Sequence, residues 1–326
     1  MNENPTGGEV QGGQEPALVR VSEPAPVSEQ APDQGQGQVL DDSHAKPQGE
    51  TEIRNYVQDD LLADGRVCAL FVAGRASNPM WQFALVFRDL VGSVPGMAIR
   101  YADFGQDVFN PEEVSNKIAA EVEKGEFGRY IVVGVGMGGQ LVYDSLRKLD
   151  GTRAEKTTGV LFGAPAGAAD IRNAGNPRVF NLIMWVLAKY KLARYLDRFR
   201  KAFWAMFGEK MDMPAKADDE LVAAYKRRQA YESQFPVATW FAQSRYFYGF
   251  KADKLTLARL VVAGAVDDDL VRDNGGWDKV TQNIEHRVIA GGHGDSVLRH
   301  WEFARIVADE AGREEKIMKE AMESFG

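Results

Sequence analysis

The sequence predicts an α/β domain in which a mainly parallel sheet is covered by helices on both of its faces. From residue 66 onward, short apolar runs rich in β-branched residues alternate with longer amphipathic stretches. Runs that are apolar on both faces are typical of strands buried on both sides. Helices between such strands indicate crossover connections, and therefore parallel pairing.

The first part of this region contains two expected strands and two expected helices. "RVCALFVAG" at 66–74 predicts a buried strand that ends in a glycine turn, and "QFALVFRDLVGS" at 82–93 has the apolar spacing of a helix. "GMAIRYADFGQ" at 96–106 predicts a second strand. "PEEVSNKIAAEVEKG" at 111–125 begins with proline and two glutamates and stops at glycine, which indicates a complete helix.

The middle part repeats the pattern. "RYIVVGVG" at 129–136 predicts a strand, "GGQLVYDSLRKLD" at 138–150 a helix, and "TTGVLFGAPAG" at 157–167 another strand. Together these segments extend the parallel sheet by two strands.

Near the C-terminus, "LARLVVAGAVDDD" at 257–269 and "HRVIAGGHGD" at 286–295 predict two more strands, and a long helix follows from about residue 299. The expected sheet therefore has about six strands. Ligands in such sheets bind at the carboxyl ends of the strands, so the polar loops there are the candidate site.

The segment from about 170 to 253 interrupts this alternation with helical patterns alone, and predicts a helical cap inserted between two strands. Its first half is basic, because residues 178–210 contain eight Lys or Arg against two acids. A basic amphipathic helix marks either an anionic ligand or a peripheral contact with lipid. The alternative, which the pattern favours, is a packing helix whose long cationic side chains extend to water.

The first fifty residues have a different composition from the rest. They are rich in Gly, Pro, Gln, Glu and Ser and contain no aromatic residue, so we expect 1–50 to be a disordered tail before one domain at 51–326. A basic start followed by an apolar core, as in a secretory signal, is missing from this stretch. The sequence also has no run of about 18 apolar residues, so no transmembrane segment is expected.

Charge and cysteine content narrow the function classes. The net charge of −8 disfavours a nucleic-acid partner, since a phosphate backbone favours a basic surface. Cys68 is the single cysteine, so a disulfide framework and a thiolate metal cluster are excluded, and a cytoplasmic location is expected. The four histidines lack metal-ligand spacing, so no metal or other cofactor is predicted. Nothing in the sequence defines the oligomeric state.

The stretch "IVVGVGMGGQLV" at 131–142 fits two different motifs. Gly134, Gly136 and Gly139 match the dinucleotide fingerprint G-x-G-x-x-G. Gly134, Gly136 and Gly138 match the nucleophile elbow G-x-S-x-G, with glycine in place of the serine. The dinucleotide motif requires an acid at the end of the next strand, and "LFGAPAG" offers none.

The elbow motif requires an acid after a later strand and a histidine after the last one, in that order. Asp267, Asp268 and Asp269 follow one late strand, and His293 follows the final one. Asp268 is the preferred acid, ahead of Asp267 and then Asp269. The alternative is that these aspartates cap a turn and that His293 is an ordinary loop histidine.

With these parts in this order, the chain resembles the α/β-hydrolase superfamily over roughly 66–312. The segments that carry the resemblance are "LFVAGRASNPMW", "YADFGQ", "GVGMGG", the helical cap, "AGAVDDDLV" and "AGGHGDS". The resemblance implies a site at the carboxyl edge of the sheet, beneath the cap. It also implies an oxyanion hole made by the backbone N–H groups of Arg75 and Met137.

The sequence departs from the superfamily at the position of the nucleophile. Gly136 has no side chain and cannot attack a substrate, whereas His293 would be the base and Asp268 its partner. Ser77 lies in the first turn and is a less suitable substitute, because it lacks the elbow geometry. Arg75 is equally well explained as a surface cation.

Three functions follow, in order of preference. The first is a ligand-binding or interaction module, or a weak hydrolase, that takes a small acyl or anionic ligand. The second is an atypical hydrolase of esters or lipids, in which Asp268 and His293 activate water or another residue supplies the nucleophile. The third is a nucleotide-binding oxidoreductase.

Overall fold

The computed structural model describes only part of the chain, and every structural statement below refers to that part. The described residues are 51–56, 67–105, 109–172, 186, 197–207, 217–272, 275–293 and 297–313. The expected tail at 1–50 lies outside them, as does much of the basic segment at 178–210.

A seven-stranded sheet forms the centre of the domain, with the strand order β1-β3-β2-β4-β5-β6-β7. Its strands are β1 (Glu52–Asn55), β2 (Val67–Val72), β3 (Ala98–Asp103), β4 (Arg129–Val135), β5 (Thr157–Phe162), β6 (Arg259–Ala265) and β7 (Ile284–Ile289). Strands β2 to β7 pair in parallel. The predicted fold class, a mainly parallel sheet with helices, is confirmed.

Strand β1 was not expected from the sequence. It is short and polar, "EIRN", and pairs antiparallel with β3 at the edge of the sheet, with Glu52 opposite Asp103. Such a segment has no apolar run to identify it. It is held in place by hydrogen bonds to the edge of β3, which would otherwise be unpaired, and not by burial of its own side chains.

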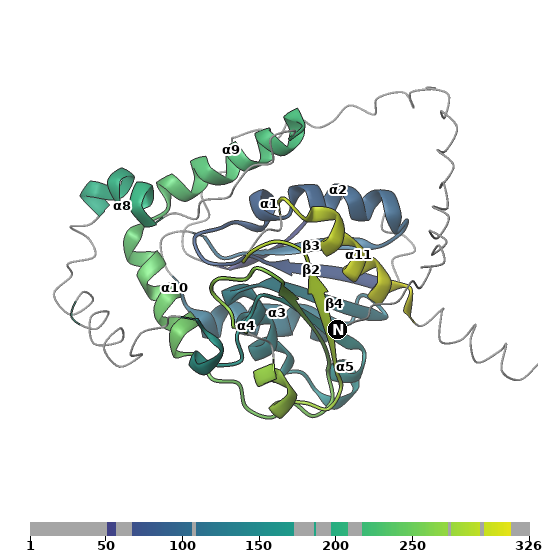
Figure 1. Ribbon diagram of the computed structural model, residues 1–326. Helices are drawn as coiled ribbons and strands as arrows, with labels where there is room; N and C mark the ends of the chain where they lie inside the picture. Colours follow the sequence, from purple (N-terminus) through teal and green to yellow (C-terminus); the bar gives the residue numbers. More distant parts are fainter. Residues whose placement is uncertain are drawn as a thin grey trace, which may run out of the picture. The chain divides into compact units, whose positions relative to one another are not determined.

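Helices cover both faces of the sheet (Figure 1). One layer contains α1 (Pro79–Gln82), α2 (Ala84–Ser93) and α11 (His300–Ala311). The other contains α3 (Pro111–Lys124), α4 (Met137–Leu146) and α5 (Gly151–Glu155). Each layer has its own apolar core against the sheet, with Phe87 and Phe303 in the first and Ile118 and Leu141 in the second.

Strand β2 shows why the sequence pattern predicts buried strands. Cys68 and Leu70 pack into the core with α3 and α4, whereas Ala69 and Phe71 pack into the core with α2 and α11. All four side chains are fully buried, so neither face tolerates a polar residue. Burial raises the pKa of Cys68 to about 12, which keeps this thiol protonated and unreactive.

The insertion between β5 and β6 is helical where it is described. It contains the 3-10 helices η2 (Ala168–Asp170) and η3 (Asp197–Phe199), followed by α8 (Arg200–Phe207), α9 (Asp219–Gln234) and α10 (Val237–Gly249). An aromatic cluster joins α8 to α10 and includes Ala76 of the loop after β2. The insertion is therefore packed against the carboxyl edge of the sheet.

Two hydrogen bonds attach α10 to α4. The Tyr246 hydroxyl donates to Asp144 Oδ2 at 2.6 Å, and Gln140 Nε2 donates to the carbonyl of Phe247 at 3.2 Å. Gln140 also donates to the carbonyl of Pro165 at 3.2 Å, after β5. Since α4 follows directly from β4, these contacts hold α10 in place beside the end of that strand.

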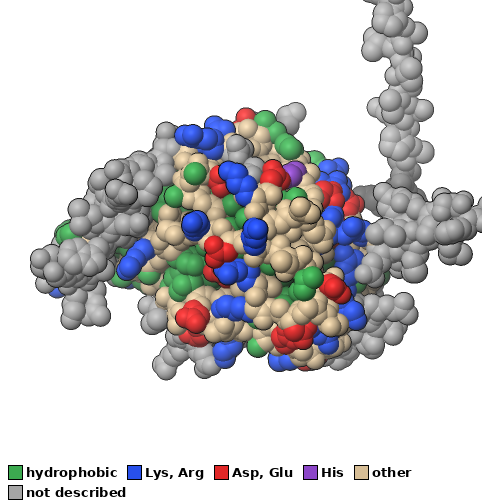
Figure 2. Space-filling view, turned by 90° about the horizontal axis from the view of Figure 1, so that it is seen from below, with side chains coloured by type: hydrophobic (Ala, Val, Ile, Leu, Met, Phe, Trp, Pro, Cys, Tyr) green, Lys and Arg blue, Asp and Glu red, His purple; other side chains and the backbone are tan. Residues whose placement is uncertain are grey.

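On the surface, Lys and Arg side chains are interspersed with Asp and Glu over the face shown in Figure 2, without a large area of one sign. Such a mixed face does not provide the basic surface that a phosphate backbone requires. None of the helices in the described ranges is both long and apolar enough to cross a membrane.

Candidate active site

The turn from β4 into α4 lies at the centre of the sheet edge. Gly136 occupies it with φ 53° and ψ −114°, a conformation that glycine adopts without strain, and its N–H donates to the carbonyl of Phe162 at 2.8 Å. In the sheet, β2 lies between β3 and β4. Helix α2, which connects β2 to β3, covers one face of the sheet, and α4, which follows β4, covers the other. The turn therefore stands at the point where the winding of the sheet reverses, which is where such sheets bind ligands.

Three of the four glycines in this turn are required by packing. A Cβ on Gly134 would lie 2.4 Å from the carbonyl of Gly138, and a Cβ on Gly138 would lie 2.4 Å from the carbonyl oxygen of Val72. A Cβ on Gly139 would lie 2.5 Å from the Cβ of Ala164. These contacts bring helix and strands together closely, so protein packing accounts for these three glycines without a bound phosphate.

Gly136 is different, because a side chain would have room there. A Cβ on Gly136 would lie 3.5 Å from His293 Nε2 and 3.9 Å from the ring of Phe247, which are ordinary contact distances. The space that a nucleophilic side chain would fill is therefore present, and it faces the imidazole.

His293 is held by Asp268 on the opposite side of its ring. His293 Nδ1 lies 3.0 Å from Asp268 Oδ2, and the side chains are 11% and 4% exposed. The other carboxylate oxygen, Oδ1, accepts N–H groups from Leu270 at 2.9 Å and Val271 at 2.7 Å. The carboxylate thus fixes the ring so that Nε2 points toward Gly136, an arrangement suited to a general base.

The environment of Asp268 favours its charged form. Burial by itself raises the pKa of Asp268, but the hydrogen bond and charge of His293 lower it, as do the N–H groups of Val271 and Leu270. The net direction is a lowered pKa, so this carboxylate stays ionised. The neighbouring Asp267 and Asp269 are exposed, and of the three it is Asp268 that contacts His293.

Gly163, at the end of β5, was missed by the sequence analysis. Its φ is 53°, and a Cβ there would lie 3.1 Å from His293 Nδ1 and 3.3 Å from Asp268 Oδ2. The close approach of His293 and Asp268 to this residue therefore requires glycine at position 163. The sequence signal for this residue was the glycine in "LFGAPAG" directly after the strand. Its contacts with His293 and Asp268 could not be predicted, because those residues are far from it in the chain.

The loop after β2 presents one backbone donor between two that are already paired. Gln82 Oε1 accepts the N–H of Gly74, and Gln243 Oε1 accepts the N–H of Ala76, each at 2.8 Å. Between them, the N–H of Arg75 has no acceptor within the described ranges. Ala76 has φ 51°, the only positive φ of a described non-glycine residue, so the loop is strained into this shape.

The N–H of Met137 is the second free donor. It is the first amide of α4, where the helix itself offers no acceptor, and none is found elsewhere in the described structure. Two N–H groups without an acceptor among the described residues, at the ends of β2 and β4, are the kind of donors that the sequence predicts for an oxyanion hole.

A small cavity of about 20 Å³ brings these groups together. It is lined by Gly74, Arg75, Gln82, Val135, Gly136, Met137, Arg228, Phe247 and His293. This volume holds about one water molecule. Ser77 is not among the lining residues, and its buried hydroxyl has no hydrogen-bond partner in the described part of the chain.

By sequence, no family model and no curated protein matches this chain. By structure, it is similar to an esterase from Thermogutta terrifontis, with a TM-score of 0.57, 12% identity, and coverage of 81% of this chain and 93% of the other. A meta-cleavage product hydrolase from Pseudomonas fluorescens has a TM-score of 0.52, 14% identity and coverage of 81% and 94%. The chain has the α/β-hydrolase fold.

An epoxide hydrolase from Bacillus megaterium has the same fold, with a TM-score of 0.50, 12% identity and coverage of 79% and 95%. These identities are too low to transfer an activity, because one fold supports many functions. The function of this α/β-hydrolase-fold protein has to be argued from the site itself.

Proposed function

We propose that this chain is an α/β-hydrolase-fold protein that binds a small carbonyl-containing ligand at a site without a side-chain nucleophile. One observation carries the proposal. His293 Nε2 lies 3.5 Å from the position of a Cβ on Gly136, yet Gly136 has no side chain to activate. An imidazole paired with a carboxylate thus faces a position that offers no group to activate, and this supports a binding role.

Ligand binding does not depend on the missing side chain. The N–H groups of Arg75 and Met137 belong to the backbone, so they remain available to a carbonyl oxygen whatever residue stands at position 136. His293 adds a further polar contact on the same cavity. A carbonyl ligand would therefore be oriented as in a hydrolase but would not form a covalent intermediate.

Slow hydrolysis by water is the second candidate, and the size of the cavity favours it. A water next to Nε2 would give its proton to His293 while its oxygen attacked the carbonyl carbon. The imidazolium would then return that proton to the leaving alkoxide, which departs as an alcohol. Asp268 would stabilise the charged imidazole throughout.

Steady-state hydrolysis by the natural protein separates the two candidates. Short and long p-nitrophenyl esters would be tested with the natural protein and with His293→Ala, with binding followed by calorimetry. Activated water predicts turnover that falls at least about tenfold in His293→Ala, since a general base contributes about 10²–10⁴-fold. Pure ligand binding predicts ester binding with no His293-dependent turnover. If esters neither bind nor react, the proposal is wrong.

A nucleotide-binding oxidoreductase remains the third interpretation of the glycine-rich turn. Its support is weak, because packing alone accounts for Gly134, Gly138 and Gly139. Titration with NAD(H) and NADP(H) tests it directly, and micromolar binding of either would favour this interpretation over the first two.

A further inference from the structure

Strand β7 lies at the end of the sheet, and its outer edge has no partner strand among the described residues. On its inner side, the carbonyls of Asn283 and Ile289 accept N–H groups from β6 and from the residue after it. Backbone groups alternate in direction along a strand, so Ile284, His286 and Val288 direct their N–H and C=O groups outward. These groups form an open row to which another strand can pair.

The two edges of the sheet differ in how well they are protected from such pairing. At the other end, β1 is a polar strand of four residues, and short edge strands offer little to a partner. β7 has six residues, includes neither lysine nor proline, and leaves Val288 73% exposed. Lysine and proline are common means of blocking an edge strand, so β7 is the less protected edge.

Apolar surface gathers around the end of β7. Three of the six large apolar residues that are exposed in the described structure belong to this region: Val266, Val288 and Trp301. The N–H of Val266 donates to the carbonyl of Ile289 at 3.0 Å, and the N–H of Ala290 donates to Glu302 Oε2 at 3.0 Å. These bonds bring the loop after β6 and the start of α11 to the end of β7. Clustered exposed apolar residues are typical of protein–protein interfaces.

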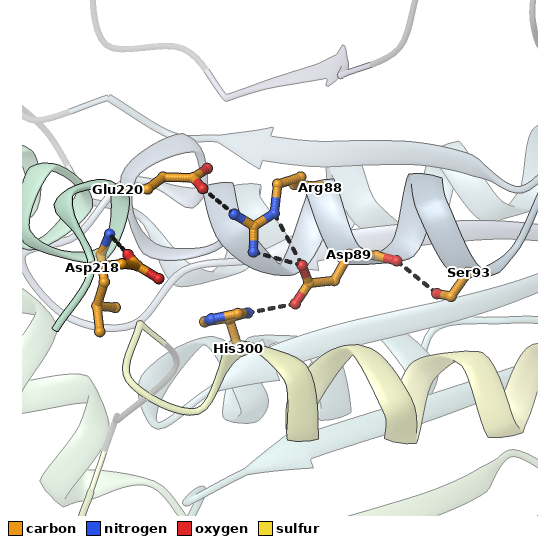
Figure 3. Close-up of polar contacts among 7 residues, drawn as sticks. Arg88, Asp89, Ser93, Asp218, Glu220 and His300 are labelled. Carbon is orange, nitrogen blue, oxygen red and sulfur yellow. Dashed lines mark hydrogen bonds and ion pairs between the residues drawn. The ribbon is translucent and has the colours of Figure 1, made fainter. Parts of the chain in front are cut away.

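The surface around the end of β7 is held in place by its own chain. Figure 3 shows His300, at the start of α11, in contact with Asp89 of α2, and Arg88 beside it paired with Glu220 of α9. Ile289 packs into the apolar core that α2 and α11 share. A partner would therefore meet a preformed surface, and binding would cost little conformational entropy.

We infer that β7 pairs antiparallel with β7 of a second copy of this chain, about a two-fold axis at His286. Most homo-oligomers are two-fold dimers in which the same surface of both chains meets. An axis perpendicular to the sheet joins the two β7 edges in antiparallel orientation and makes one continuous sheet. The outward N–H and C=O groups of Ile284, His286 and Val288 then all find partners in the second copy.

The charges of β7 favour this register over its neighbours. With the axis at His286, Glu285 lies opposite Arg287 of the second copy, and Arg287 lies opposite Glu285. An axis at the preceding residue would place Glu285 opposite Glu285, and an axis at the following residue would place Arg287 opposite Arg287. Opposite charges stabilise a directly facing pair, and like charges destabilise it. The side chains of Arg287 and Glu285 are 42% and 34% exposed, so both can meet their counterparts.

The other face of the strand also fits the pairing. Ile284 lies opposite Val288 of the second copy, so an exposed valine becomes covered by an apolar side chain. At the axis, His286 meets His286 of the second copy, and its Nε2 lies 2.6 Å from Asp278 Oδ1 of its own chain. The carboxylate of Asp278 offsets the repulsion between the two imidazoles when they are protonated.

The first test is sedimentation velocity of the full chain over about 1 to 200 μM, a range that covers weak and moderate dimers. About 0.15 M salt limits the repulsion between two chains that each carry a net charge of −8. We expect a monomer–dimer equilibrium. Val288→Lys should raise its dissociation constant at least about tenfold, because a charged edge disfavours pairing and the two-fold axis doubles each substitution. Val91→Lys, which changes an exposed valine of α2, should leave it unchanged.

Two results of this test would overturn the inference. One is a natural protein that stays monomeric over the whole range of concentration. The other is a dimer whose dissociation constant is unchanged by Val288→Lys, or is raised equally by Val91→Lys.

Hydrogen exchange of the natural protein needs no substitution, so it decides the question even where a variant fails to fold. The amides of His286 and Val288 should exchange at least about tenfold more slowly in the concentrated dimer than in the dilute monomer. Equal and fast exchange in both would mean that the dimer uses another surface. Equal and slow exchange in a monomer would mean that the chain's own residues cover the edge. Either result would overturn the inference.

The register is tested by mixing two charge variants, Glu285→Lys and Arg287→Glu. Each variant alone has like charges opposite each other across the axis, so each should dimerise more weakly than the natural protein. A mixture of the two has opposite charges at both positions and should dimerise more strongly than either variant by itself. If two cooperatively melting variants show no such gain on mixing, the register is wrong. These experiments do not involve the cavity beside His293, so their outcome is independent of the proposed function.

Discussion

Under the proposed function, replacing Gly136 with serine should complete a hydrolytic triad with His293 and Asp268. A Cβ at this position would lie 3.5 Å from His293 Nε2, with its other near neighbours at 3.9 Å, so the added side chain begins without a clash. The hydroxyl is one bond further, about 1.4 Å, and can therefore come within the roughly 2.6–3.2 Å that a nucleophile and its base require. The two backbone donors of the oxyanion hole would remain unchanged.

The substitution should cost a modest amount of stability. A non-glycine residue at φ 53° and ψ −114° is strained by about 1–3 kcal/mol. Serine also has less conformational freedom than glycine in the unfolded chain, and this stabilises the folded state by about 0.4–1 kcal/mol. The two ranges leave a net cost of between about 0 and 2.6 kcal/mol, which lowers the melting temperature by no more than about 10 °C in a domain of this size.

Hydrolysis of p-nitrophenyl acetate and butyrate is the functional assay. We expect Gly136→Ser to be at least about a hundredfold faster than the matched control Gly136→Ala, because loss of a triad nucleophile costs about 10⁶-fold in a well-studied protease. Gly136→Ala has the same Cβ and the same backbone strain but no hydroxyl. A second control, His293→Ala in the Gly136→Ser background, should remove most of the gain.

Labelling with a fluorophosphonate probe provides an independent measurement, since the probe reacts with activated serines. Gly136→Ser should be labelled, and the natural protein and Gly136→Ala should not. If Gly136→Ser melts within the expected range yet is neither labelled nor faster than Gly136→Ala, then His293 does not act on position 136. The interpretation of this turn as a nucleophile elbow would then be wrong.

Three further predictions concern the tail and the surroundings of His293. Deletion of residues 1–48 should change the melting temperature by less than about 1 °C, and limited proteolysis should leave a core that begins between 50 and 66; a larger loss of stability would show that the tail packs on the domain. Gly163→Ala should lower the melting temperature and abolish any His293-dependent hydrolysis, because its Cβ would lie 3.1 Å from the imidazole at a φ of 53°; unchanged activity would contradict the close contact. Asp268→Asn should destabilise the protein at pH 7, since the pKa of Asp268 is lowered in the folded state and its carboxylate stabilises that state at any pH above the unfolded value of 3.8. That difference in unfolding free energy, measured with denaturant, should shrink as the pH falls below about 4, and a difference that persisted at lower pH would refute the charge-based explanation.

The sheet and most of its helices were predictable from the sequence because their signals are local. Each central strand is buried on both faces, so its residues have to be apolar whichever strands it pairs with. The helix at Pro111–Lys124 is likewise defined by the residues next to its two ends. The Asn110 side chain caps its N-terminus, and Gly125, at φ 68°, ends it. Strand β1 has no such signal, since its place depends on the edge of β3 alone.

The sequence also determined which residues could form the site, through the chain order of Gly136, Asp268 and His293. Only the tertiary structure determined the distances and contacts between these three residues. Asp268 differs from Asp267 and Asp269 by burial and by its contact with His293, and no local pattern distinguishes three successive aspartates. Gln82, Gln243 and Arg228 are polar residues on helices, and nothing in the sequence shows which of them meet a loop or a cavity. A contact between residues far apart in the chain depends on the packing of whole elements, so it becomes visible only when those elements are assembled.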